Sequence, residues 1–232
     1  MKLPLLLSVP HAGIKVPPEV GDLCILSRRD IADDSDGGAS EIYYPLRPNV
    51  LRFVTTTVAR AVIDMNRAET DRSRDGVVKT HTCLDVPVYR RYPSNRLVEK
   101  LIHGYYKPYH TSLDVYGREA VYGIDCHTMA EVGPPVGPDP GRQRPCICLS
   151  NAGFTCPRHE LESLATCLQA AFGRTVLLNH PFKGGYIIRS SSHAIPWIQI
   201  EISRNTFFSN AEKSERLREA LERWCRKHLR IV

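Results

Sequence analysis

The stretch YGIDCHTM, residues 122–129, is mostly apolar, yet it carries Asp125 and His127 two positions apart. Its β-branched and aromatic residues do not alternate strictly with polar ones, which predicts a strand buried on both faces of a sheet. Side chains at positions i and i+2 of a strand point to the same side. We therefore expect Asp125 and His127 to face one site, and Cys126 to point away from it.

Apolar runs of the same character, each bounded by turn residues, recur along the chain and predict further strands. The predicted strands are 3–9, 51–58, 61–65, 120–126, 144–150, 175–179, 184–189 and 195–203. Helical patterns lie between them, at 40–46, 94–117, 157–173 and about 211–229. Strands that alternate with helices predict one α/β domain over residues 1–232, with helices on both faces of a mixed sheet. The Pro- and Gly-rich segment 131–145 is expected to be a long loop beside a site rather than a linker between domains.

Composition excludes several classes of protein. With 42% apolar and 24% charged residues among 232, the chain is typical of a globular domain and not of a disordered one. No apolar run approaches the roughly 18 residues of a membrane-spanning helix, and the run near the N-terminus is too short for a signal core. A cytoplasmic protein is therefore expected.

The net charge of +6 is scattered along the chain. It is densest near the C-terminus, where acids and bases alternate at helical spacing, so neither a nucleic acid nor a membrane is expected as partner. The eight cysteines are irregularly spaced and predict buried thiols. Cys146 and Cys148 form a CxC rather than a CxxC pair, so a cysteine metal site is the less favoured alternative.

Polar side chains gather where predicted strands end, which is where ligands sit in α/β sheets. His11 follows the first strand, and His127 closes the strand quoted above. Two imidazoles and one carboxylate are the usual ligands of a catalytic zinc ion, and Asp125 could then orient a ligand. The carboxylates on offer for the third ligand are Asp33, Asp34, Asp36 and Glu41. Helix capping is the alternative role for any one of these four.

Three other groups carry chemical signals. Glu201 lies in an apolar strand, so it either pairs with a cation such as Arg204 or works as a general base with a shifted pKa. Asn66 and Arg67 suit an acidic substrate, although Arg67 could instead form a structural salt bridge with Asp64 or Asp71. Gly184 and Gly185 allow the backbone to approach a ligand closely, although a Gly-Gly pair can also mark an ordinary tight turn.

Seven motifs in this order resemble the N-formylglutamate amidohydrolase family. They are VPHAG (9–13), DSDGGASEIYYPL (34–46), AVIDMNR (61–67), YKPYHTSL (106–113), GIDCHTM (123–129), NHPFKGGYII (179–188) and WIQIEISR (197–204). The resemblance spans about residues 5–210. The motifs differ from the family pattern at Ala12 and Thr128, where the family often has serine, and in the segment that follows Asp36.

The resemblance implies a three-layer α/β/α sandwich similar to the zinc carboxypeptidases. It implies a zinc-dependent amidohydrolase of histidine degradation that releases formate from N-formyl-L-glutamate. It places the metal on His11, Asp36 and His127, with Asp34 or Glu41 as alternatives to Asp36, and it makes Glu201 the general acid/base. It puts Asn66 and Arg67 where they hold the substrate's carboxylate or polarise its carbonyl, so Arg67 is expected to be catalytic together with Glu201. Asn66, Arg67, Arg204, Gly184 and Gly185 are the residues expected to contact the substrate, and another divalent metal could replace zinc.

Other functions remain open from the sequence alone. A zinc amidase or carboxypeptidase acting on a peptide or a cell-wall fragment would have the same ligands, and the 131–145 loop could shape a larger groove. A thiol hydrolase that uses Cys126 is a different mechanism. A non-catalytic binding protein on the same fold is a different class, although it has no need for Glu201 together with two histidines at strand ends.

Overall fold

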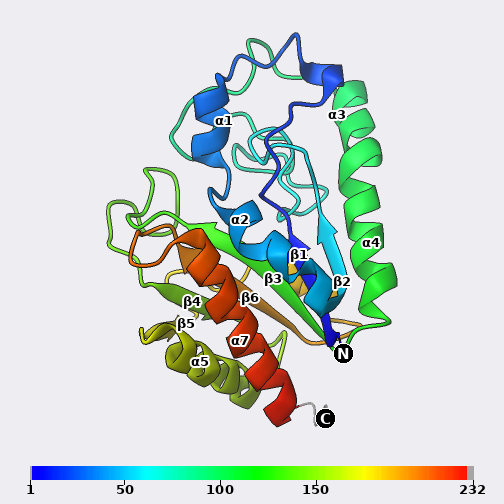
Figure 1. Ribbon diagram of the computed structural model, residues 1–232. Coiled ribbons are helices and arrows are strands. Elements are labelled where there is room, and N and C mark those ends of the chain that lie inside the picture. The colour runs from blue at the N-terminus through cyan, green and yellow to red at the C-terminus, as the bar shows by residue number, and fades with distance from the viewer. Residues whose placement is uncertain (1, 229–232) are drawn as a thin grey trace.

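The computed structural model describes residues 2–228 and is built on a six-stranded sheet with the order β2-β1-β3-β6-β4-β5 (Figure 1). The strands are β1 (Leu3–Val9), β2 (Val50–Thr55), β3 (Tyr122–Met129), β4 (Ile147–Ser150), β5 (Val176–Leu178) and β6 (Trp197–Ser203). Strands β2, β1, β3 and β6 are mutually parallel, whereas β4 runs antiparallel to β6 and parallel to β5. The predicted mixed sheet is confirmed.

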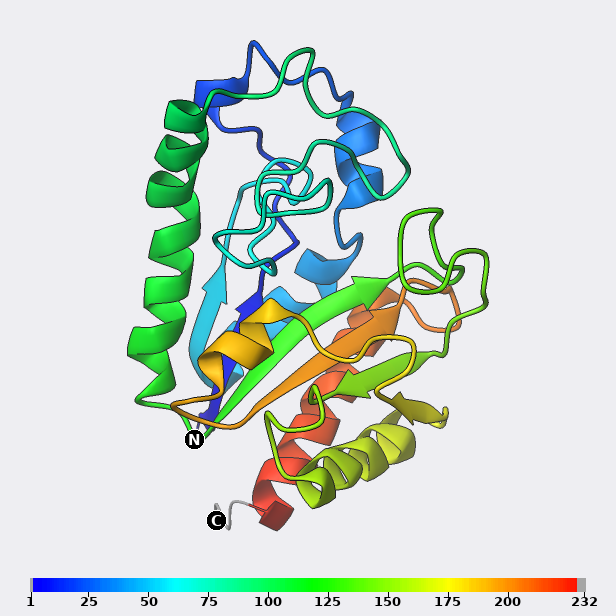
Figure 2. The same ribbon diagram turned by 180° about the vertical axis from the view of Figure 1, so that it is seen from behind.

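Helices cover both faces of this sheet. One face carries α2 (Ala39–Tyr43), α5 (Arg158–Phe172) and α7 (Asn210–His228). The other carries α6 (Tyr186–Ser191) and a continuous helical run of α3 (Asn95–Leu101), the π-helical η3 (Ile102–Tyr106) and α4 (Lys107–Gly117), as the view from behind in Figure 2 shows. The remaining short helices are η1 (Pro18–Val20), α1 (Arg28–Asp34) and η2 (Tyr44–Asn49). The predicted α/β fold with three layers is thus confirmed.

Each face of the sheet has its own hydrophobic core. Leu5 and Leu7 of β1 pack with α2, α5 and α7, whereas Leu6 packs with α4 and α6 on the opposite face. All eight residues of β3 are buried. A central strand that is covered on both faces needs apolar side chains on both, which explains why its sequence lacks polar alternation.

Two of the eight predicted strands are wrong. In the predicted strand 184–189, residues 186–189 belong to α6 and the two glycines precede it, while residues 61–65 form turns in which Val62 and Ile63 are buried. A short buried helix and a short buried strand produce the same apolar run, so periodicity cannot separate them. Helix α1 was not predicted, although Ser27 and Asp30 form the reciprocal capping box that begins it.

The remaining predicted elements are confirmed within a few residues. The helical pattern at 94–117 corresponds to α3, η3 and α4, and the pattern at 157–173 corresponds to α5. Gly173 ends α5 with a left-handed φ of 60°. Residue 229, the predicted last residue of the C-terminal helix, lies outside the described part of the chain.

Two long segments without regular helices or strands lie beyond the carboxyl ends of the parallel strands (Figure 1). They are residues 56–94, which lie between α1 and the α3–α4 run, and the 131–145 loop. Within residues 2–228, no helix combines the length and the apolar character needed to cross a bilayer.

We expect Gly123→Ala to destabilise the protein by about 1–3 kcal/mol, because it overpacks a core. A Cβ at Gly123 would lie 2.2 Å from the indole ring of Trp197 on the neighbouring strand. The melting temperature measured by circular dichroism should fall by several degrees. Gly104→Ala is the matched control, because nothing lies within 4 Å of its Cβ and alanine favours a helix. Equal melting temperatures for the two variants would contradict this account of the core.

Candidate active site

His11, Asp36 and His127 meet at the carboxyl edge of the sheet. His11 lies two residues beyond β1, and His127 lies on the adjacent parallel strand β3, with 4.8 Å between the centroids of the two rings. Asp36 follows α1, and its backbone N–H donates to the carbonyl of His11 at 3.1 Å. The chain order reverses between β1 and β3, the position where α/β sheets bind ligands.

The three side chains present a compact set of donor atoms. Oδ2 of Asp36 lies 3.0 Å from Nδ1 of His127 and 3.6 Å from Nδ1 of His11. All three residues are buried, and one ligand atom from each falls within 4.8 Å of the others. Within residues 2–228 no other group of histidine, cysteine or carboxylate side chains has this arrangement. The cysteine metal site that the sequence left as an alternative does not form in this part of the chain.

Each imidazole is oriented by a second carboxylate. Nε2 of His11 lies 2.8 Å from Asp64, and Nε2 of His127 lies 2.8 Å from Asp125. When Nε2–H donates to a carboxylate, Nδ1 carries the lone pair, which is the tautomer that a metal requires. The Asp125–His127 pairing at positions i and i+2 agrees with the expectation from the sequence.

The donor set fits a divalent metal ion. Nδ1 of His11 is buried and has no hydrogen-bond partner, which is costly for a polar atom unless something else fills that role. It points toward the same oxygen of Asp36 as Nδ1 of His127 does. Two neutral imidazoles and one carboxylate with oriented outer nitrogens are the ligands expected at a catalytic zinc or a similar ion.

Electrostatics keep Asp36 ionised. Burial raises the pKa of this carboxyl, but His11 and His127 outweigh burial and hold the pKa well below its usual value. Oδ1, the oxygen turned away from the rings, lies 3.8 Å from Arg60 and 3.6 Å from Arg204. Oδ2 also accepts the backbone N–H of Thr128. The two arginines therefore fix one oxygen of Asp36 while the other faces the imidazoles.

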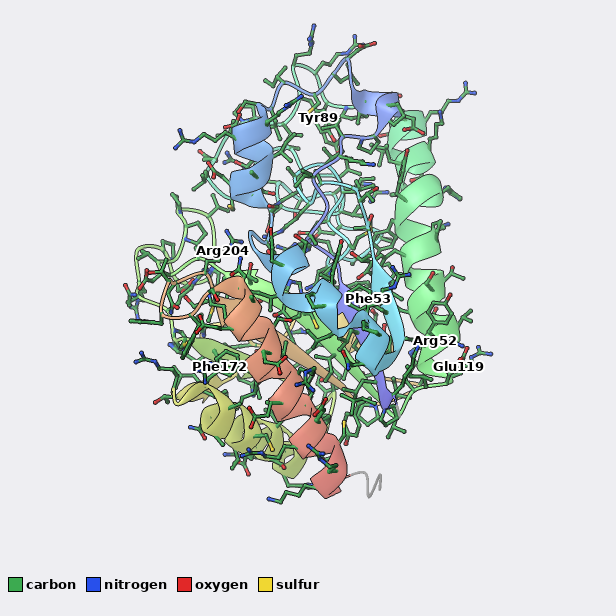
Figure 3. All side chains as sticks on the ribbon, in the orientation of Figure 1. Arg52, Phe53, Tyr89, Glu119, Phe172 and Arg204 are labelled. Carbon is green, nitrogen blue, oxygen red and sulfur yellow. The ribbon has the colours of Figure 1, made fainter. Side chains whose placement is uncertain are left out.

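Arg204 was expected at the substrate, or paired with Glu201, and the structure places it differently. Its guanidinium donates to the carbonyl of Ser35 at 2.6 Å and to Oγ1 of Thr128 at 3.1 Å. Figure 3 labels it at the carboxyl edge of the sheet, just beyond β6. These contacts hold the segment that carries Asp36 against the end of β3, so Arg204 positions a candidate ligand.

Glu201 lies on β6 in register with His127 of β3 and is buried. Its Oε1 accepts a hydrogen bond from the amide of Gln199 at 2.8 Å. Burial raises the pKa of Glu201 to about 7, an effect that His127 opposes and the charge of Asp36 reinforces. No ion pair to Glu201 is present among the described residues, so the pairing with Arg204 does not form. A carboxyl group with a pKa near neutrality can both accept and return a proton.

Asn66 organises the site rather than pointing a free amide at it. Its Oδ1 accepts the backbone N–H of Ile187 at 2.8 Å, and its Nδ2 lies 3.4 Å from Asp125 and 3.3 Å from Nε2 of His127. A Cβ at Gly185 would lie 2.3 Å from Nδ2 of Asn66. The close approach that Gly185 allows is therefore to Asn66. Gly184 has a φ of 113°, a conformation that side chains rarely adopt.

Arg67 pairs most closely with Asp75, which the sequence did not suggest, and more distantly with Asp64, one of the two partners that it did suggest. Its guanidinium donates to the carbonyl of Asp75 at 2.7 Å and pairs with the Asp75 carboxylate, while Asp64 lies at 4.0 Å. Asp75 in turn lies 3.0 Å from the buried ammonium of Lys79. Arg67 still borders the cavity described below.

The alternative carboxylates lie outside the histidine cluster. Asp34 ends α1, where it pairs with Lys79 at 3.2 Å and accepts the backbone N–H of Cys83 at 2.6 Å. Glu41 is exposed on α2, and Asp33 lies 3.6 Å from Arg29. The alternative role of helix capping does not apply to these carboxylates or to Asp36. Ser27 is the N-cap of α1, and no side chain caps the N-terminus of α2.

A cavity of about 400 Å³ opens over the cluster. Its lining includes the predicted residues His11, Asp36, Asn66, Arg67, His127, Gly184, Gly185, Glu201 and Arg204. The 131–145 loop contributes Val132, Pro134, Val136, Gly137, Pro138 and Arg144, so this loop borders the cavity. Arg144 is held by Asp139 of the same loop at 2.7 Å and lies over the ring of Phe182. The volume suits a small-molecule ligand.

Sequence reasoning missed Arg60 and Arg144, and it did not assign Asp64 to His11. Arg60 and Asp64 sit four residues apart, a spacing that suggests an ion pair, and their side chains lie 3.2 Å apart. The sequence around Arg144 has no feature that predicts a place at the cavity.

Cys126, as expected, lies in the core on the face opposite the cavity, where burial raises the pKa of its thiol well above the usual value. A buried neutral thiol on that face does not suit a nucleophile.

The family model for N-formylglutamate amidohydrolase matches residues 3–208. The chain belongs to the N-formylglutamate amidohydrolase family. The family name describes the hydrolysis of an amide, and the chain is accordingly a hydrolase that acts on an amide bond.

Curated relatives and solved structures agree with the family. N-formylglutamate deformylases of Pseudomonas putida and Pseudomonas aeruginosa are each 25% identical, over 91% and 89% of this chain and 84% and 82% of their own lengths. The crystal structure of N-formylglutamate amidohydrolase from Ralstonia eutropha has a TM-score of 0.80 at 21% identity, covering 100% of this chain and 96% of that one. A gene product of Agrobacterium tumefaciens has a TM-score of 0.73 at 18% identity, covering 97% and 90%. Both of these structures share the fold of this chain.

If the cluster of His11, Asp36 and His127 binds a divalent ion, Asp36→Asn should weaken zinc binding more than Asp64→Asn does. The reason is that it replaces a negatively charged ligand of the ion with a neutral amide. Asp64→Asn should weaken zinc binding by about 10–100-fold, because it replaces the charged acceptor that orients His11 with a neutral amide. Affinity is measured by competition with a chromogenic chelator, and circular dichroism checks folding.

The control is Glu41→Gln, which removes the exposed alternative carboxylate and should leave zinc affinity unchanged. A loss of affinity in Glu41→Gln with none in Asp36→Asn would reassign the third ligand.

Proposed function

We propose that this chain hydrolyses the N-acyl amide of an acidic amino acid, with N-formyl-L-glutamate as substrate and formate and L-glutamate as products. The observation that carries the proposal is the convergence of three buried donor atoms, one of them without a hydrogen-bond partner, beside a buried glutamate. The names of the Pseudomonas relatives support this choice of substrate.

A zinc ion is the proposed cofactor, held by Nδ1 of His11, Nδ1 of His127 and Oδ2 of Asp36. When bound, such an ion supplies Lewis-acid chemistry, which polarises a carbonyl and makes water more acidic. Asp64 and Asp125 orient the two imidazoles, while Arg60 and Arg204 hold the remaining oxygen of Asp36.

Glu201 is the proposed general base and acid. Its carboxylate takes a proton from the water molecule that attacks the formyl carbon, and it later gives this proton to the amide nitrogen as the carbon–nitrogen bond breaks. The second proton of the water stays on the new carboxyl group and passes to the amine, so the products are formate and an ammonium group. Gln199 aims the carboxylate by donating to Oε1, and the raised pKa suits both proton transfers.

Arg67 is the proposed partner of the substrate's α-carboxylate. A guanidinium binds carboxylates through two parallel hydrogen bonds. Asp75 occupies Arg67 in the free chain, but Asp75 also lies 3.0 Å from Lys79, which can compensate its charge when Arg67 turns to the substrate. Asn66, Gly184 and Gly185 shape the wall against which the substrate rests, since all three border the cavity.

Purified protein should release formate from N-formyl-L-glutamate, and Glu201→Gln should lower kcat by about 10²–10⁴-fold, the usual contribution of a general base. The zinc content of the variant should stay at the wild-type level. Glu131→Gln, a change in an exposed residue of the 131–145 loop, is the control and should keep full activity. Turnover by Glu201→Gln at the wild-type rate would remove Glu201 from the mechanism.

Prolonged dialysis against a chelator should abolish formate release, and added zinc should restore it. The physical reason is that the bound ion would supply the Lewis-acid polarisation of the carbonyl. Formate release is measured in a coupled assay alongside metal analysis of each sample. Activity that persists in samples shown to be free of metal would contradict the metal-dependent mechanism.

A further inference from the structure

The basic side chains that border the cavity differ in how far the chain itself neutralises them. They are Arg60, Arg67, Arg144, Lys183 and Arg204. Arg60 lies 3.2 Å from Asp64, Arg144 lies 2.7 Å from Asp139, and Arg67 pairs with Asp75. Arg204 is engaged by two carbonyls and a hydroxyl, with Asp36 at 3.6 Å. Four of the five bases therefore already have acceptors or acids from the chain.

Lys183 is the exception. Its side chain is exposed, and within residues 2–228 it has neither an ion-pair partner nor a hydrogen-bond acceptor. An exposed ammonium keeps its hydration, so leaving it unpaired costs little in the free protein. A free cation at the edge of a cavity for an anionic ligand is available to bind that ligand without first breaking an internal ion pair.

The backbone around Lys183 is fixed on both sides. The carbonyl of Phe182 accepts a hydrogen bond from Oγ of Ser150 on β4 at 2.7 Å. The N–H of Gly185 donates to Oε1 of Gln199 at 2.7 Å, and the amide nitrogen of Gln199 donates to Glu201. Lys183 thus starts from a backbone tied to the same side chain that aims the proposed general base.

We propose that Nζ of Lys183 binds the side-chain carboxylate of the acyl amino acid and selects acidic over neutral substrates. This inference rests on the proposed function. The α-carboxylate lies two bonds from the scissile amide nitrogen, so its partner must be near the histidine cluster. The side-chain carboxylate carbon of glutamate lies four bonds from that nitrogen, two bonds farther out than the α-carboxylate, which matches an exposed base at the cavity edge.

Lys183→Met tests the inference, because it removes the charge and keeps most of the length of the side chain. We expect the KM for N-formyl-L-glutamate to rise about tenfold, the value of one charge-assisted hydrogen bond, with little change in kcat. With N-formyl-L-glutamine, the same variant should behave like the wild type. Lys183→Arg should recover most of the affinity for formylglutamate.

Lys15→Met is the matched control, because Lys15 is also an exposed lysine and lies outside the cavity lining. It removes the same charge, so its KM should stay within about twofold of the wild type if long-range steering is minor. An equal rise in KM for Lys15→Met and Lys183→Met would overturn the inference. An equal rise for formylglutamate and formylglutamine with Lys183→Met would overturn it as well.

Calorimetric titration with glutarate separates this inference from the proposed function. Glutarate offers two carboxylates but no amide, so its binding needs no turnover, and Lys183→Met should weaken it about tenfold. If the wild type hydrolyses no N-formyl amino acid while Lys183→Met still weakens glutarate binding, the proposed function fails and anion binding by Lys183 stands. If formylglutamate is hydrolysed and glutarate binding is unchanged by Lys183→Met, the role of Lys183 fails alone.

Discussion

The burial of several carboxylates in one small volume is the constraint on which the site depends. The side chains of Asp36, Asp64 and Asp125 are each at most 4% exposed, and Glu201 is buried on β6, the strand next to β3. A buried ionised carboxylate is stable only when cations or hydrogen-bond donors compensate it. Burial raises the pKa of the Asp64 carboxyl, but His11, Arg67 and Arg60 outweigh burial and hold this pKa well below its usual value. Burial lowers the pKa of the His127 imidazole, but Asp125 and its neighbours hold this pKa well above its usual value. A divalent cation between the rings would compensate this concentration of negative charge.

The sheet delivers these groups with little freedom of movement. His127 and Glu201 lie on adjacent central strands that are buried on both faces, so their separation is set by strand pairing. His11 and Asp36 are less constrained by the sheet, and a backbone hydrogen bond between them compensates for this. The long segment 56–94 contributes Arg60, Asp64 and Asn66 from outside the sheet. It is fixed by contacts to the histidines themselves, so the segment and the cluster stabilise each other.

The sequence predicts the sheet-borne part of this site well and the loop-borne part poorly, for a physical reason. The carboxyl ends of parallel strands lie at the same edge of a sheet. Strand assignments alone therefore predict that His11, His127 and Glu201 lie close together. Residues 61–65 and 184–189 resembled strands because burial of Ile63 and Ile187 imposes the same apolar composition on turns and short helices. The partners of Arg67 and Arg204 depend on how irregular backbone folds back, which no periodic pattern encodes. Asp75 and Ser35 were therefore not foreseen as their partners.

The choice between Asp34 and Asp36 shows how charge pairing selects a candidate ligand where spacing cannot. Both carboxylates are buried, and they are separated by Ser35, whose extended backbone ends α1. Asp34 already has a fully buried ammonium, that of Lys79, together with a backbone N–H, so a further cation would compete with existing contacts. Asp36 meets its arginines only at 3.6–3.8 Å and only through Oδ1, which leaves Oδ2 facing two imidazoles. Oδ2 of Asp36, which no arginine within residues 2–228 contacts, is the oxygen that faces Nδ1 of both histidines. This asymmetry between the two oxygens favours Asp36 as the third ligand.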